Sequence, residues 1–118
     1  GKAVFSWDRV LTAAFPDGAK PHEKNMHGGF NEDPKTGVVY TGIPGYGLCT
    51  ISPDLKTWSL LGSDERLKAN IHGIVVFEHD GVTSIAVTQS EDQRVLIIGL
   101  DGTVKQQLDM PKVILFDD

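Results

Sequence analysis

The tetrapeptide Asn25-Met26-His27-Gly28 returns 45 residues later as Asn70-Ile71-His72-Gly73. Two further landmarks repeat at a spacing of 47, namely Thr41 with Thr88 and Asp54 with Asp101. One insertion of two residues between the first and second landmarks reconciles the spacings. A period of this length is typical of repeat architectures, in which each repeat is one supersecondary unit. The chain therefore contains two consecutive copies of one unit.

Each unit holds four short runs of β-branched and aromatic residues bounded by turn residues, a pattern that predicts strands. The expected strands are 27–31, 38–41, 47–51 and 57–61 in the first unit, and 72–78, 83–88, 94–99 and 103–108 in the second. Asp80-Gly81 and Asp101-Gly102 supply the positive φ angles that tight hairpins demand. A single helical turn capped by Ser63 is expected at Ser63–Lys68. Four antiparallel strands in about 45 residues are typical of a β-propeller blade.

The two ends of the chain resemble parts of a further blade. Lys2–Phe15 aligns with the third and fourth strands of a unit, and Val113–Asp118 resembles the first strand of one. The expected organisation is terminal strands and a connector at 1–24, a first blade at 25–69, a second at 70–112 and the first strand of a shared blade at 113–118. Propellers commonly close their ring with strands from both termini, because an open edge would break the circle.

A closed propeller has about four to eight blades, more than this chain contains. The predicted fold is therefore all-β, with antiparallel four-stranded propeller blades and a ring completed by homo-oligomerisation. A homo-dimer with three blades per copy would give six blades, and so would a homo-trimer with two blades per copy plus terminal strands. The competing interpretation is a fragment of a longer propeller.

Composition excludes several classes of partner. The net charge of −5, from 11 Lys and Arg against 16 Asp and Glu, gives no basic surface for nucleic acid. No apolar run approaches the roughly 18 residues that a membrane span needs, so no membrane partner is expected. The single cysteine, Cys49, excludes an internal disulfide and is compatible with the cytoplasm. The compartment stays open, with the cytoplasm slightly favoured.

The repeated N-x-H-G motif, the D-G or P-x-x-G hairpins and the apolar second strand ending in Thr resemble blades of six-bladed propellers of the NHL and SMP-30/gluconolactonase-like type. The resemblance covers nearly the whole chain at the level of the blade pattern. It implies the propeller architecture, while members of that group range from calcium-dependent lactone hydrolases through zinc- or magnesium-dependent lyases to binding modules. The chain has His, and no acidic residue, at the start of its inner strands, which argues against lactonase chemistry.

His27 and His72 are the main candidate site residues. First strands of propeller blades line the central channel, so the two imidazoles would project toward one axis, with Asn25 and Asn70 beside them as further ligand contacts. Imidazole is a common ligand of zinc and other divalent metals. The structural alternative is that both histidines hydrogen-bond the backbone of a neighbouring blade and stabilise the joint between blades.

Two functions follow from this pattern. The leading hypothesis is an oligomeric propeller that binds a small ligand or partner at its central channel or rim. The alternative is a metal-dependent lyase or hydrolase whose His-lined channel holds a divalent metal such as zinc. Whether the chain is an enzyme, which ligand it binds and whether it has a cofactor stay open. His79 in a hairpin tip and Cys49 in a strand are expected to be a solvated side chain and a small buried one.

Overall fold

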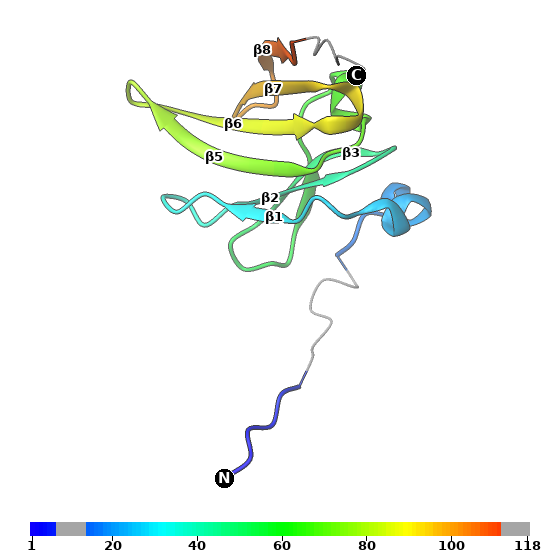
Figure 1. Ribbon diagram of the computed structural model, residues 1–118. Coiled ribbons are helices and arrows are strands. Elements are labelled where there is room, and N and C mark those ends of the chain that lie inside the picture. Colours follow the sequence, from blue (N-terminus) through cyan, green and yellow to red (C-terminus); the bar gives the residue numbers. More distant parts are fainter. Residues whose placement is uncertain (7–13, 112–118) are drawn as a thin grey trace, which may run out of the picture.

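The computed structural model describes residues 1–6 and 14–111, and this part of the chain is all-β with short 3-10 helices (Figure 1). Sheet A consists of β1 (Phe30–Glu32), β2 (Val39–Ile43), β3 (Gly47–Ile51) and β4 (Trp58–Leu60). Sheet B consists of β5 (Gly73–His79), β6 (Val82–Gln89), β7 (Arg94–Gly99) and β8 (Val104–Asp109). Both sheets are antiparallel, with strands that are consecutive in sequence lying side by side. The prediction of two four-stranded antiparallel units is confirmed.

The turns use the residues that the sequence pattern singled out. Asp80 and Gly81 have φ angles of 51° and 76° between β5 and β6, which suits a two-residue hairpin. Asp54 and Asp101 occupy matching turns, after β3 and β7 respectively. Each carboxylate accepts a hydrogen bond at 3.0 Å from the backbone N–H two residues further on. Because this local bond closes the turn in each unit, the Asp landmark of the repeat is structural.

The described residues form three 3-10 helices: η1 (Asp17–Asn25) before β1, η2 (Glu65–Lys68) between β4 and β5, and η3 (Ser90–Asp92) between β6 and β7. The turn η2 was expected, but its cap is Asp64 rather than Ser63, because the Asp64 carboxylate accepts the Arg66 N–H at 3.0 Å. The helix η1 was expected only as a proline-containing connector. Pro21 lies inside η1, where its missing N–H disfavours α-helical bonding. The buried Ala19 holds η1 against Ile43 and Cys49 of sheet A.

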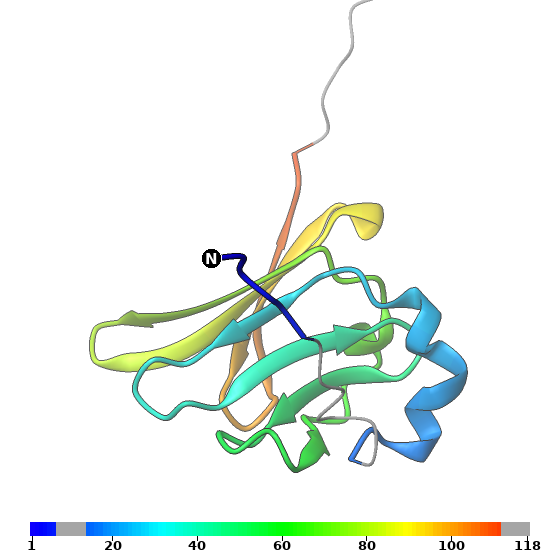
Figure 2. The ribbon, with the colours of Figure 1, turned by 90° about the horizontal axis from the view of Figure 1, so that it is seen from below.

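The main core lies between the two sheets, and Figure 2 shows sheet A lying across one face of sheet B. Tyr40 and Leu48 of sheet A pack with the buried face of sheet B, which carries Ile74, Ile85, Val87, Leu96 and Ile98. Leu67 of η2 and Ile71 in the following connector complete this cluster. The connector of the second unit therefore joins the two sheets into one hydrophobic core.

The two sheets pack through faces that do not correspond. In β3 the carbonyl of Leu48 accepts from the Leu61 N–H on the β4 side, and in β7 the N–H of Gly99 donates to the Thr103 carbonyl on the β8 side. Residues two apart in a strand share a face and a bonding direction, so Val95, four residues before Gly99, bonds in the same direction as Leu48. Leu48 and Val95 are also 47 residues apart, as the two Asp turns are, so they occupy corresponding positions. Leu48 nevertheless packs against the opposite face of sheet B. The two sheets therefore pack with different faces in contact, rather than through the same face of each.

This correspondence corrects one landmark of the sequence repeat. Thr41 pairs with Cys49, and Thr88 pairs with Val95. If Leu48 corresponds to Val95, the counterpart of Thr41 is Val87 rather than Thr88. The turn between β2 and β3 differs in length from its counterpart between β6 and β7, and this shifts the register by one residue.

The terminal segments bear on the prediction of a shared blade. Residues 1–6 are exposed and pair with no described strand. Residues 7–13, within the expected strands of 2–15, and residues 112–118, which contain the expected strand 113–118, lie outside the described residues. Ring closure through the termini and homo-oligomerisation therefore stay predictions. Within the described ranges, no helix has the length and apolar character needed to cross a bilayer.

Candidate functional site at the start of the inner strands

The structure brings His27 and His72 together, although they are 45 residues apart in the chain. Their Nε2 atoms lie 3.5 Å apart, and the ring centroids are 4.7 Å apart with planes at 79°. Each histidine lies just before the first strand of its sheet. β1 and β5 contact each other and run in the same direction in Figure 1. The repeated motif therefore forms one pair of exposed imidazoles.

The His27 ring is oriented by its own backbone. Its Nδ1 lies 2.8 Å from the carbonyl oxygen of Asn25, and a carbonyl only accepts, so Nδ1 carries the proton that is donated. In the neutral ring, Nε2 of His27 then keeps its lone pair. That lone pair faces Nε2 of His72 at a distance long for a hydrogen bond. His27 Nε2 is therefore a nitrogen acceptor at the surface, directly beside Nε2 of His72.

The N-x-H-G sequence explains this placement. In both motifs the second residue packs in a hydrophobic core. Ile71 is buried between the sheets, and Met26 packs against Ile43 and Cys49 of sheet A. The His that follows points away from that core, and both imidazoles are exposed. Gly28 lies where a Cβ atom would stand 2.2 Å from the Ile71 carbonyl oxygen. Its lack of a side chain permits the close approach of the two motifs.

A pocket of about 350 Å³ adjoins the histidine pair. It is lined by Lys24, Asn25, His27, Pro44, Asn70 and Glu91. Three of these were predicted from the repeat, and both asparagines of the motif are among them. The buried Oδ1 atom of Asn70 accepts no hydrogen bond from any described residue. The pocket therefore combines two asparagine side chains, an imidazole and side chains of both charges, which suits a small polar ligand.

Sequence reasoning missed Lys24, Pro44 and Glu91 as pocket residues. Glu91 is exposed, and the polar turn that carries it borders the pocket. The three residues come from η1, from the β2–β3 turn and from η3. No spacing rule connects such loops, because only the packing of sheet A on sheet B brings them together.

The remaining histidines and the cysteine lie apart from this pair. His79 is exposed at the β5–β6 hairpin tip, 3.3 Å from Asp80, as expected. His22 is half-buried with its ring against Gly45. Cys49 is fully buried, and burial raises the pKa of its thiol to about 11, so it is no nucleophile at neutral pH. No cluster of three or more His, Cys, Asp or Glu occurs among the residues that the structure describes.

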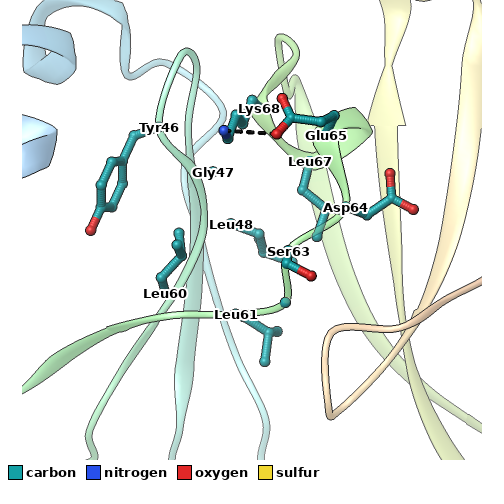
Figure 3. Close-up of a pocket in the computed structure, with 11 residues that line it drawn as sticks. Tyr46, Gly47, Leu48, Leu60, Leu61, Ser63, Asp64, Glu65, Leu67 and Lys68 are labelled. Atoms are coloured by element: carbon teal, nitrogen blue, oxygen red, sulfur yellow. Dashed lines mark hydrogen bonds and ion pairs between the residues drawn. The ribbon is translucent and has the colours of Figure 1, made fainter.

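A second recess, of about 230 Å³, lies between sheet A and η2 (Figure 3). Leu48, Leu60, Leu61 and Leu67 form its apolar part. Polar groups on its rim already have partners, because Lys68 bonds Glu65 at 3.0 Å and Asp64 bonds Arg66 at 2.7 Å. With its rim charges paired, this recess offers a ligand fewer free polar groups than the pocket beside the histidine pair.

Comparison with known proteins found no match: no protein-family model, no curated protein and no solved structure shows significant similarity to the chain. The functional argument therefore depends on the geometry of the site.

Proposed function

We propose that this chain is a propeller segment that binds a small ligand at the His27–His72 pair and in the adjoining pocket. The observation that carries the proposal is the 3.5 Å separation of the two Nε2 atoms at the surface. The Asn25 carbonyl orients the His27 ring, and the Asn70 side chain lines the same pocket. In a closed ring of such units, these groups would face the central channel, because they lie at the start of the inner strands.

A divalent metal such as zinc is the second candidate ligand, and the geometry of the pair favours it. Two Zn–N bonds of about 2.0–2.1 Å at a tetrahedral angle place the nitrogens roughly 3.3–3.4 Å apart. The Nε2 atoms lie close to that separation, at 3.5 Å. Metal-bound histidines usually donate their other ring N–H to a carbonyl or carboxylate, as His27 does to Asn25. Two protein ligands would leave coordination positions open for a small molecule.

The metal is also what the alternative function, a lyase or hydrolase, requires. A bound zinc ion would polarise a carbonyl or lower the pKa of a bound water. The residues of this chain would contribute the two imidazoles that hold it and the Asn70 amide that orients a substrate. The alternative function therefore requires that the histidine pair bind a metal.

Calorimetric titration of tag-free protein with Zn²⁺ tests the site. We expect saturable binding in the wild type, and at least a roughly tenfold loss of affinity in both His27→Ala and His72→Ala, because each removes one of two nitrogen ligands. His79→Ala is the matched control, since His79 is an exposed histidine at a hairpin tip.

Equal zinc affinity in wild type and both site variants would exclude the metal. A ligand-observed NMR screen with small polar compounds then tests the pocket itself, using Asn70→Ala as the reporting variant. Failure of both measurements would overturn the proposed function.

A further inference from the structure

The outer face of sheet B carries an apolar surface that is partly exposed in the single chain. Val75, Ala86 and Ile97 form one row across β5, β6 and β7, because each pairs directly with the next. Val95 and Leu108 lie in the neighbouring row. Val75 is 56% exposed and Leu108 is 46% exposed. An apolar row across several strands is characteristic of a sheet face that packs on another layer.

The corresponding face of sheet A shows what such a face does in this molecule. Tyr40 corresponds to Ala86, and Leu48 corresponds to Val95, by the strand correspondence described above. In sheet A these positions are 4% and 0% exposed, because they pack against sheet B. The face that sheet A buries against the following unit is therefore the face that sheet B leaves open.

The outer face of sheet A has the complementary feature. Phe30, Thr41, Cys49 and Leu60 form one row across its four strands. The helix η1 covers the middle of this row through Ala19, but Phe30 is 58% exposed. Phe30 pairs with Thr41 as Ile74 pairs with Val87, so by strand pairing its counterpart in sheet B is Ile74. Ile74 is 6% exposed because sheet A covers it. In the second unit, the preceding unit covers this position. In the first unit, Phe30 holds the same position and is exposed.

We propose that the outer face of sheet B binds the outer face of sheet A of a second copy of this chain. Val75, Ile97 and Leu108 of one copy would pack on Phe30 and Leu60 of the next. The contact would continue between copies the same packing that joins the two sheets within a copy. Because the two faces differ, the interface is heterologous, which allows a ring to close. The proposal does not depend on ligand binding by the histidines.

Sedimentation velocity over a range of concentrations tests the interface. We expect the wild type to self-associate, and Val75→Arg and Phe30→Arg each to raise the dissociation constant at least roughly tenfold, since a buried charge without a partner is costly. Both positions are exposed in the single chain, so both variants should keep the wild-type circular dichroism spectrum. Leu55→Arg, in the turn after β3 and outside both rows, is the control that should associate normally.

Mixing the two variants distinguishes this interface from a symmetric one. A Val75→Arg copy keeps an intact sheet A face, and a Phe30→Arg copy keeps an intact sheet B face. The equimolar mixture should therefore form a one-to-one dimer that neither variant forms alone. A monomeric wild type, variants that associate as the wild type does, or a mixture that stays monomeric would each overturn the proposal. Zinc titration of the same variants reports on the histidine site separately.

Discussion

Gly28 has a steric role in the repeated motif. A Cβ atom there would stand 2.2 Å from a backbone carbonyl oxygen of Ile71, which cannot rotate away. At the equivalent Gly73, the nearest atom to a Cβ would be the Thr88 hydroxyl at 2.8 Å, which belongs to a side chain. Gly28 therefore faces a backbone atom that is fixed in place, whereas Gly73 faces a side-chain atom that can move.

This difference leads to a prediction about stability. Gly28→Ala should lower the free energy of unfolding by about 1–3 kcal/mol, because the backbone of the second motif must shift. Gly73→Ala should cost less, since the Thr88 side chain can change rotamer. Urea denaturation followed by tryptophan fluorescence measures both values. Equal losses in the two variants would show that the backbone contact at Gly28 is not limiting.

At the scale of elements, the short helix η2 depends on its first residue. Asp64 accepts hydrogen bonds from the Arg66 side chain and from the Arg66 backbone N–H, and these hold the pKa of Asp64 at about 2. A carboxylate with a lowered pKa stabilises the fold above its ordinary pKa near 4. That contribution is lost as the pH falls toward 2, where the carboxylate becomes protonated in the folded state. The cap therefore makes the stability of η2 dependent on acidity.

Asp64→Ala should lower the free energy of unfolding by about 1 kcal/mol at neutral pH, a typical value for removal of a helix cap. The loss should shrink between pH 4 and pH 2, because the wild type loses the same interaction there. Thermal unfolding of both proteins across this range measures the difference. Asp54 and Asp101 also have pKa values lowered by hydrogen bonds to Ser52 and Thr103, respectively, and titrate in both proteins. A constant difference between pH 4 and pH 2 would contradict the role of the charge.

At the scale of the whole molecule, Ile71 holds the two units together. Ile71 is 1% exposed. Its side chain packs against Gly42 of sheet A and against the core residues of sheet B. An ion pair between Lys35 and Glu78 and a bond from the Val76 N–H to Asn31 Oδ1 also connect the units. The charged pair is exposed and adds little, so the apolar contact dominates the junction.

Ile71→Ala should therefore destabilise the chain by about 2–5 kcal/mol and leave one cooperative transition, since both sheets share the core that it fills. Met26→Ala, at the same position in the first motif, should cost less because Met26 is only half-buried. Differential scanning calorimetry of the two variants measures both effects. Two separate transitions in the wild type would show that the units fold independently.

The residue pattern alone predicts the two four-stranded units, because the alternation and turn residues that specify a strand act over a few neighbouring residues. It also determined that His27 and His72 occupy equivalent places, since a repeated motif repeats its local structure. The tertiary structure alone decided the 3.5 Å approach of the two rings, the contribution of Lys24 and Glu91 to the pocket, and the burial of η1. That Thr41 corresponds to Val87, and not to Thr88, likewise follows only from the pairing between strands. These features depend on contacts between residues far apart in the chain, which local patterns do not encode.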